Sequence, residues 1–446
     1  MKNLITLLLL CIGVSSVFAQ EATSVPTKLS LQEAIDYAIK NNYDNKIAAK
    51  NIEAAKEKKW ETTTTGLPQI SGTVDYQHWL KQQVQLADIN GDGVDDELIF
   101  GTKQSVNAGV TLTQLIFDGT YLVGLQSAKT YLKISEQAKE KTELATREAI
   151  INAYGNVLVA EKSLEILENN KQVLTKNLNE TQKIFENGLT EEENVEQLQI
   201  TLGNLESNIR NTERLKDIAY QMLNIALGNK INKTLELTDS LETLTLQYSD
   251  LSLLSKTFDI NNHIDYQIAE NDREANRLLL KLEKNRQLPT LSAFINYQYS
   301  SFSDEFSFFD SDQKWFDSSL LGVSLNIPIF GTFRLRSRIK QAAIELENSD
   351  IRLEETKQKL NLQAQKAKSE YQLSLENYET AKKNLNLAER IEKKQQVKFF
   401  EGLSSSFDLL QAQNQLYTQQ NTYVQSMLNV IAKKAQLETA LNIPVK

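Results

Sequence analysis

The chain has 446 residues, of which 24% are charged and 41% hydrophobic, and its formal net charge is −9. This acidic balance disfavours a nucleic-acid partner, because phosphates are held by basic side chains, and it disfavours anionic lipid surfaces for the same reason. The sequence contains a single cysteine, Cys11, which lies in the leader described next, so the mature protein is expected to have no thiol chemistry.

The first residues have the layout of a secretory signal peptide. Lys2 precedes an apolar stretch over residues 4–11, and small residues lead up to Ala19. We therefore expect residues 1–19 to be a signal peptide that is cleaved after Ala19, and residues 20–446 to be the mature protein. Lipidation at Cys11 is a less favoured alternative, because the apolar run before this cysteine is short.

The mature chain opens with a helix-start pattern. Ser30 is followed three residues later by Glu33, the spacing of a capping box in which both residues satisfy unpaired amides at a helix N-terminus. Beyond the leader there is no apolar run near the roughly 20 residues of a membrane-spanning helix. We therefore expect any insertion into a membrane to use strands that close into a barrel.

Four short stretches alternate apolar and polar residues with the two-residue period of strands. A half-buried sheet in a soluble domain would give the same alternation, but an apolar row outside, a polar row inside and tyrosines near the strand ends suit a membrane barrel with a watery lumen. Only Phe294 interrupts a polar row. Four strands are too few to enclose water, so several copies must pool them, and a trimer supplying twelve strands is the smallest cyclic assembly with room for a channel. The stretches are residues 70–77, 106–113, 291–299 and 321–327.

The segment between the first two strands, residues 88–97, resembles the opening of a calcium loop. Oxygen-bearing side chains recur at alternate positions in Asp88, Asn90 and Asp92, and Asp95 offers a further carboxylate. The usual closing glutamate is replaced by Ile99. The alternative is a solvated acidic loop without an ion. In the barrel interpretation this loop is extracellular, and so is the aromatic-rich segment 301–317 between the last two strands.

Two segments without helix breakers, residues 125–187 (apart from Gly155) and 332–401, each predict one helix of more than 60 residues, or roughly 100 Å. Helices of this length need packing partners along their whole course. In the second, a seven-residue interval predicts a left-handed coiled coil whose seam passes from leucine to alanine. The seam consists of Ile339, Leu346, Leu353, Leu360, Ala367, Ser374, Ala381 and Ala388.

The two halves of the chain resemble each other in the same order. GLPQISGTVDYQ at residues 66–77 matches QLPTLSAFINYQ at 287–298, and VTLTQLIFDGT at 110–120 matches VSLNIPIFGT at 323–332. We therefore expect two internal repeats, at about 29–232 and 250–444, each with a helix, two strands, a long helix, a turn and a helix.

A glycine follows each long helix in a matching position. Gly188-Leu189 and Gly402-Leu403 stand where the helices must reverse, and glycine adopts positive φ there without strain. These residues are expected to form the tips of two helical hairpins, far from the strands.

Taken together, these segments resemble the TolC-like outer-membrane efflux protein family over essentially the whole mature chain. The resemblance is carried by the duplicated order of the motifs rather than by any single one. The motifs are LSLQEAIDYAIKNN (29–42), the Leu-Pro pairs at 67–68 and 288–289, IPIFG (327–331) and FEGLSSSFDLLQAQ (400–413).

The resemblance implies an α+β membrane protein, with a long coiled-coil α-helical barrel and four strands per chain that contribute to a trimeric 12-stranded outer-membrane β-barrel. It would be a homotrimeric exit duct of a tripartite efflux or type I secretion system, reaching from the outer membrane and its lipid into the periplasm. A periplasmic adaptor, docked at the hairpin tips, and an inner-membrane transporter would be its partners. The substrate, whether a drug, a metal ion or a protein, is not determined by this chain.

The resemblance also implies a periplasmic entrance just after the second tip. Asp408 matches the first acidic position of the family, whereas Gln411 stands where a second carboxylate is common and Ser404 where some members have an arginine. Threefold symmetry would gather three Asp408 carboxylates and favour cations. The alternative role of Asp408 is to cap the helix that begins there.

Two other functional classes are weighed against a channel. An enzyme is disfavoured, because His78 and His263 are isolated and the sequence has no nucleophile motif or phosphate-binding glycine loop. A periplasmic coiled-coil adaptor or structural protein is the stronger rival, since it would also be helical, acidic and free of cysteine. It would not need four strands with an apolar outer row.

Overall fold

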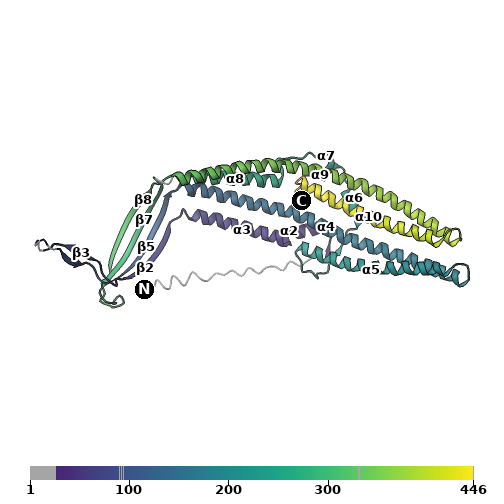
Figure 1. The fold of residues 1–446 in the computed structure, drawn as a ribbon, viewed down its shortest axis with the longest axis horizontal. Helices are drawn as coiled ribbons and strands as arrows, with labels where there is room; N and C mark the ends of the chain where they lie inside the picture. Colours follow the sequence, from purple (N-terminus) through teal and green to yellow (C-terminus); the bar gives the residue numbers. More distant parts are fainter. Residues whose placement is uncertain (1–26, 90, 92, 94, 330–331, 445–446) are drawn as a thin grey trace.

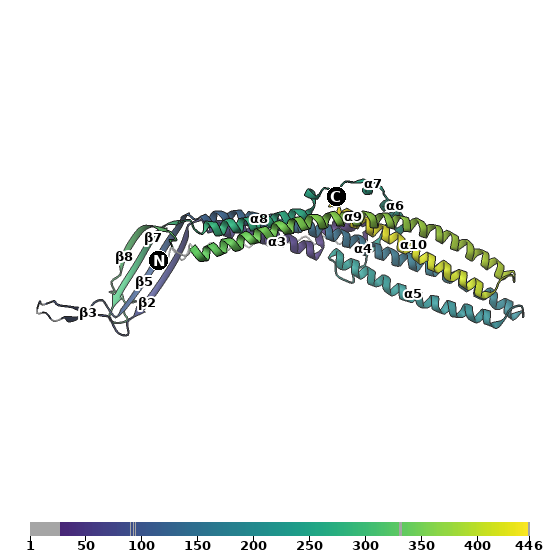
Figure 2. The same cartoon turned by 45° about the horizontal axis from the view of Figure 1, so that its top comes forward.

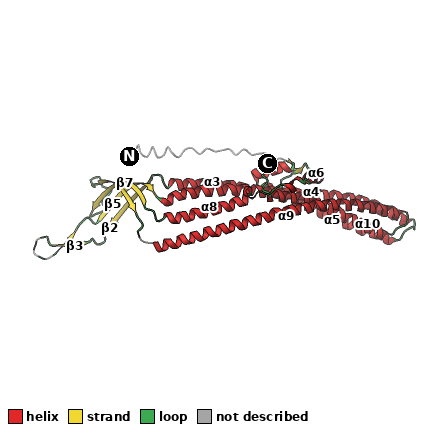
Figure 3. Ribbon diagram, turned by 90° about the horizontal axis from the view of Figure 1, so that it is seen from above, coloured by secondary structure: helices red, strands yellow, loops and turns green. Residues whose placement is uncertain are grey.

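The computed structural model describes residues 27–444 except Asn90, Asp92, Val94 and residues 330–331. The expected signal peptide, with Cys11, lies outside the described residues. The molecule is long and narrow, with a sheet at one end and two helical hairpin tips at the other (Figure 1). A view from above shows the main sheet at one end and helices along most of the remaining length (Figure 3).

Both halves of the chain contain two strands followed by a long helix and a returning helix. The first half contains α2 (Leu31–Asn41), α3 (Tyr43–Thr64), β2 (Gln69–His78), β5 (Gln104–Phe117), α4 (Gly119–Glu186) and α5 (Glu192–Leu227). The second half contains α8 (Ile264–Asn285), β7 (Thr290–Ser303), β8 (Phe316–Asn326), α9 (Thr332–Phe400) and α10 (Ser406–Ala440). The four predicted strands and both predicted long helices are therefore confirmed.

Smaller elements lie between these. A hairpin of β3 (Val84–Ala87) and β4 (Asp96–Ile99) projects beyond the sheet, and β1 (Lys28–Leu29) pairs in parallel with β6 (Glu236–Leu237). The connection between the halves holds α6 (Leu241–Tyr248), α7 (Ser252–Ser255) and the 3-10 turn η1 (Ile260–Asn262).

The first helix starts with the predicted capping box and is broken once. Ser30 accepts a hydrogen bond from the amide of Glu33, and the Glu33 carboxylate accepts one from the amide of Ser30. The break between α2 and α3 was not predicted. It falls at Asn42, whose extended backbone ends α2 and whose side chain caps α3 by accepting from the amide of Asp44 at 2.8 Å.

The main sheet has four antiparallel strands in the order β2-β5-β7-β8. Strands β5 and β7 each have a partner on both sides, whereas β2 and β8 each have one partner within the described chain. The two halves of the chain therefore meet in this sheet through β5 and β7.

The long helices α4, of 68 residues, and α9, of 69, each fold back as a hairpin with α5 and α10 respectively. Both hairpins end at the same level, opposite the sheet (Figure 2). Along α9 the predicted seam is buried from Leu360 to Ala388 and only half-buried from Ile339 to Leu353. No helix in the described residues has an apolar stretch long enough to cross a membrane.

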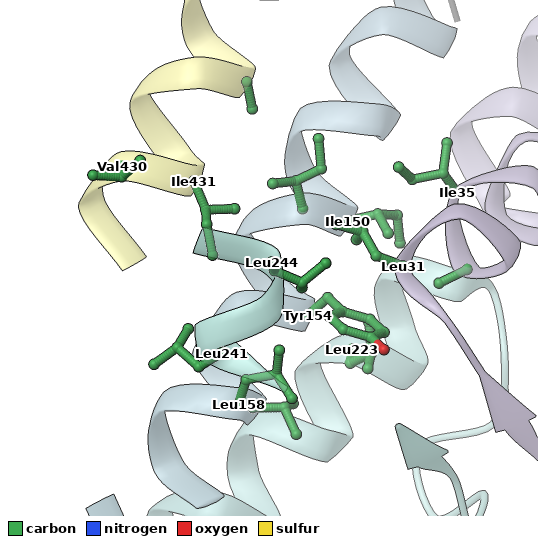
Figure 4. Packing of buried hydrophobic residues seen from close by; sticks show 14 of the residues in the cluster. Leu31, Ile35, Ile150, Tyr154, Leu158, Leu223, Leu241, Leu244, Val430 and Ile431 are labelled. Atoms are coloured by element: carbon green, nitrogen blue, oxygen red, sulfur yellow. The ribbon is translucent and has the colours of Figure 1, made fainter. Parts of the chain in front are cut away.

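The main hydrophobic core lies midway along the molecule, where six helices meet the β1–β6 pair. Figure 4 shows Leu31, Ile150, Leu223 and Leu244 around the fully buried ring of Tyr154. The Tyr154 hydroxyl lies 3.0 Å from both the carbonyl oxygen of Leu29 and the carboxylate of Asp239. Burial is the main cause that raises the pKa of this phenol, so it is neutral at physiological pH.

Candidate functional site

The four-stranded sheet presents one apolar and one polar face. The strand register aligns Ile70, Leu112, Ile295 and Leu321 in one row across all four strands. Side chains of this face are strongly exposed within the chain: Val74 is 76% exposed and Leu321 73%. An apolar sheet face this open to solvent needs an apolar environment or a partner.

The opposite face is polar and linked by side-chain hydrogen bonds. Thr73, Gly109, Gln298 and Ser318 form one row across the strands. The Gln298 amide donates to Asn107 Oδ1 at 3.1 Å, and in a neighbouring row the Asn296 amide donates to the Thr111 hydroxyl at 2.8 Å. This face suits contact with water.

Phe294, which interrupts the polar row in the sequence, is explained by its neighbour across the strands. It pairs with Gly322. A Cβ atom on Gly322 would lie 2.4 Å from the Phe294 ring, so the ring lies directly over the glycine. The aromatic ring thus fills the space left by the missing side chain.

The two helical reversals at the far end have the same backbone geometry. At the first, Gly188 has φ +70° and the amide of Leu189 donates to the carbonyl of Ile184 at 3.0 Å. At the second, Gly402 has φ +73° and the amide of Leu403 donates to the carbonyl of Lys398 at 2.8 Å. Both are Schellman endings. Leu189 and Leu403 are largely exposed, so each tip presents one leucine to solvent.

The helices that leave the two tips start differently. Helix α10 starts with a capping box, in which Ser405 Oγ accepts from the amide of Asp408 and the Asp408 carboxylate accepts from the amide and hydroxyl of Ser405. Helix α5 follows its N-cap residue Glu191, whose side chain makes no capping hydrogen bond. The capping role weighed for Asp408 in the sequence is therefore confirmed.

Asp408 retains its charge in this setting. Hydrogen bonds from Ser405 and then Ser404 hold the pKa of the Asp408 carboxyl below its usual range. Ser404 Oγ donates to Asp408 Oδ2 at 3.2 Å, so two of the three predicted entrance residues are in contact. The third, Gln411, is exposed on the following turn of α10.

The acidic loop lies at the end of the projecting β3–β4 hairpin. The Asp88 carboxylate accepts hydrogen bonds from the amides of Gly91 at 2.7 Å and Gly93 at 2.9 Å, and Asp95 is exposed. The other two predicted ligands, Asn90 and Asp92, lie outside the described residues. Among the residues that are described, no three His, Cys, Asp or Glu side chains are grouped closely enough to hold a metal ion.

The contacts between the two helical hairpins were not predicted from the sequence. The Asn170 amide donates to Gln420 Oε1 at 2.8 Å, and the Gln396 amide donates to Asn177 Oδ1 at 2.9 Å. Asparagine and glutamine are common on exposed helix faces, so the sequence alone does not show that Asn170 and Asn177 lie buried on the same stripe of α4 as Leu174. The two hairpins are thus joined by uncharged polar pairs as well as by apolar contacts.

The chain is similar to known proteins both in sequence and in fold. The family model described as Outer membrane efflux protein matches residues 34–229 and 260–442. The chain is 23% identical to the outer membrane protein TolC of Vibrio cholerae over 249 residues, which cover 53% of this chain and 54% of TolC. The chain thus spans about half the length of that relative.

Two further proteins are similar over most of their length. The probable efflux pump outer membrane protein TtgC of Pseudomonas putida is 22% identical over 413 residues, which cover 92% of this chain and 82% of TtgC. The crystal structure of the outer membrane protein VceC from Vibrio cholerae superposes with a TM-score of 0.72 at 15% identity, covering 93% of this chain and 97% of VceC. The likeness to VceC concerns the fold.

Proposed function

Because the chain belongs to the outer membrane efflux protein family, we propose that three copies of it close into one continuous channel. The chain is an outer-membrane efflux protein that serves as an exit duct. The number of copies, the closed barrel and the partners are the parts that we propose.

The open edges of the sheet support the trimer. Strands β2 and β8 each have one partner in the described chain, which leaves a row of unpaired backbone groups on the outer side of each. Such edges favour pairing with another strand. Joining β8 of one copy to β2 of the next pairs both edges, and three copies give twelve strands, enough to enclose water.

The two faces of the sheet support its orientation. In this assembly the row of Ile70, Leu112, Ile295 and Leu321 contacts outer-membrane lipid, and the row of Thr73, Gly109, Gln298 and Ser318 lines the lumen. This is the apolar-out and polar-in arrangement of membrane barrels.

The far ends of the hairpins are the proposed contact sites for partners in the periplasm. Exposed leucines on tight reversals, Leu189 beside Gly188 and Leu403 beside Gly402, offer matching apolar contacts for a periplasmic adaptor. The adaptor would join the duct to an inner-membrane transporter of a tripartite efflux or type I secretion system. TtgC, whose name describes an efflux pump component, supports the efflux alternative.

We propose that Asp408 favours cations at the periplasmic entrance, with Ser404 holding its carboxylate and Gln411 adding no charge. Hydrogen bonds from Ser405 and Ser404 hold the carboxylate at the tip, and threefold symmetry would gather three of them. Replacing Asp408 by asparagine should reduce the cation-to-anion permeability ratio in planar bilayers. An unchanged ratio rejects this role.

The loop at the end of the β3–β4 hairpin is proposed to bind calcium through Asp88, Asn90, Asp92 and Asp95, on the strength of their alternating spacing. Isothermal titration with calcium chloride at millimolar concentration tests it, with Asp88→Ala as the matched variant. Absence of heat from the wild-type protein rejects the site.

The apolar outer face carries the proposal, and two adjacent residues on opposite faces test it. An arginine in place of Val74 would face lipid and cost about 2–4 kcal/mol per copy near the bilayer midplane, whereas an arginine in place of Thr73 would face water in the lumen. We expect Val74→Arg to reduce sharply the protein recovered from outer membranes and Thr73→Arg to leave it near the wild-type level.

The same pair separates the channel from the adaptor alternative. A periplasmic adaptor or structural protein would not insert the sheet into lipid. Equal recovery of both variants in a soluble periplasmic fraction would therefore overturn the channel proposal.

A further inference from the structure

A pocket of about 310 Å³ lies at the end of the sheet farthest from the helices, beside the base of the β3–β4 hairpin. Its size is at the lower end of the range for sites that bind small molecules. None of the residues that line it carries a charge, in a protein of which 24% of residues are charged. Its walls combine three aromatic rings, from Trp79, Phe100 and Phe302, with amide and hydroxyl side chains.

The strand register assigns this pocket to the polar face of the sheet. Gln77 and Ser105 are paired across β2 and β5, and Ser105 is paired with Phe302 on β7. All three follow the same alternation as Asp75 and Asn107, which belong to the polar face. If that face lines the channel, as proposed above, the pocket opens into the lumen near its outer mouth.

Two hydrogen bonds and an aromatic contact hold parts of the pocket wall in place. The amide of Trp79 donates to the carbonyl of Lys103 at 2.8 Å, and the Gln82 side chain donates to the carbonyl of Gly101 at 2.9 Å. The ring of Phe302 lies 6.4 Å from that of Phe316, between centroids, on the same face. The pocket is therefore formed before any ligand arrives.

Several of its polar groups have no partner in the described chain. The side-chain amides of Gln77 and Gln83 make no hydrogen bond there. The side chain of Asn107 uses its oxygen as an acceptor but not its amide nitrogen as a donor. The aromatic rings are also accessible, since Phe100 is 65% exposed and Phe302 49%. Accessible rings next to free amides favour a ligand with both apolar and hydrogen-bonding surfaces.

We propose that this pocket binds a neutral sugar ring. The C–H face of a sugar packs on an aromatic ring, whose face is electron-rich, while its hydroxyls pair with amides and hydroxyls as both donors and acceptors. The absence of charged groups in the lining disfavours ionic ligands. A purely aromatic ligand is less suited, because it would leave the amides of Gln77 and Gln83 without partners, and unpaired polar groups lose affinity when they are covered.

Binding is measured by fluorescence in a variant that keeps a single tryptophan. The sequence has three tryptophans, so replacing Trp60 and Trp315 by phenylalanine leaves Trp79 as the only emitter. The purified protein in detergent is titrated with maltohexaose, cellohexaose and mannohexaose at millimolar concentration. We expect at least one hexaose to change the Trp79 emission with saturation, and Phe100→Ala and Gln83→Ala each to weaken its binding about tenfold.

A matched control removes an aromatic ring outside the pocket. Phe309 is exposed on the neighbouring loop and does not line the pocket, so Phe309→Ala should bind the hexaose like the parent protein. Gln83 makes no hydrogen bond in the described chain, so its replacement should not impair folding. Saturable binding of indole without binding of any hexaose would overturn the sugar assignment, and so would the absence of saturation with all four probes.

The placement of the pocket in a channel lumen rests on the proposed function. A second measurement tests the sugar pocket and the channel separately. Conductance in planar bilayers is recorded first without sugar and then with the hexaose added on the side of the outer mouth. A conducting protein that binds no hexaose overturns this inference alone. A protein that binds the hexaose but does not conduct overturns the channel alone.

Discussion

Replacing Gly228 by alanine should destabilise the junction where α5 meets the turn between α2 and α3. Gly228 has φ +77°, a region that costs other L-residues about 1–2 kcal/mol. An added Cβ would lie 2.2 Å from the carbonyl oxygen of Asn41 and 3.0 Å from the Cα of Asn42, both backbone atoms. The segment that must move includes the Asn42 side chain, which donates to the carbonyl of Ala226 at 2.7 Å.

Losing that hydrogen bond in a partly buried place adds about 1–3 kcal/mol, so the total is about 2–5 kcal/mol. With an unfolding entropy of about 2.1 cal/mol/K per residue, this corresponds to a fall of about 2–5 °C in the unfolding temperature. Circular dichroism of the helices during heating in detergent measures it.

Two variants isolate the cause. Gly203 lies within α5 and has nothing within 4 Å of an added Cβ, so Gly203→Ala should stabilise the helix by about 0.5–1 kcal/mol. Asparagine tolerates positive φ, as Asn442 does at the matching position of the second half, so Gly228→Asn should retain only the steric part of the loss. If Gly228→Ala unfolds at the same temperature as Gly203→Ala, the reasoning from steric overlap is wrong.

Three other changes test the core, a helix cap and the coiled coil. Tyr154→Phe removes a buried hydroxyl that bonds to Asp239 and should cost about 1–3 kcal/mol, read as a lower urea midpoint; an unchanged midpoint contradicts it. Burial lowers the pKa of His263, whose Nδ1 caps α8, so its stabilising contribution is present above pH about 6.5 and is lost as the pH falls through the lowered value. The unfolding temperature of the wild-type protein should therefore fall more steeply between pH 7.5 and 5.5 than that of His263→Asn, which keeps the cap. Parallel curves for the two proteins would count against this role of His263. Leu360→Ala on the buried seam of α9 should cost about 2–5 kcal/mol, whereas the exposed Leu362→Ala should change stability by less than about 0.5 kcal/mol, and similar losses would refute the assigned seam.

The elements with a strong internal period could be predicted from the sequence. The alternation of apolar and polar residues from Ile70 to Gln77 predicts which face of the sheet each residue occupies. The seven-residue repeat through Leu360 and Ala381 predicts which side of the helix is buried against other helices. The glycines at 188 and 402 were predictable as reversals because positive φ favours glycine.

Elements that depend on distant contacts were not predictable. The β1–β6 pair has two residues in each strand and is set by the core around Tyr154, including the bond from its hydroxyl to the carbonyl of Leu29. The break at Asn42 depends on Gly228, which follows the C-terminal end of α5 and lies against the backbone of Asn41 and Asn42. Similarly, the pocket beside Trp79 combines residues from two loops and three strands, so no local pattern indicates it.

The different starts of α5 and α10 have a consequence for local opening at the tips. A capping box of Ser405 and Asp408 satisfies amides that begin α10, whereas no side chain caps the amides that begin α5 after Glu191. Uncapped helix ends fray at a lower free energy. The amide protons of residues 192 and 193 should therefore exchange with solvent sooner than those of Ser405 and Asp408, so the α4–α5 tip offers partners a deformable surface and the α9–α10 tip a rigid one.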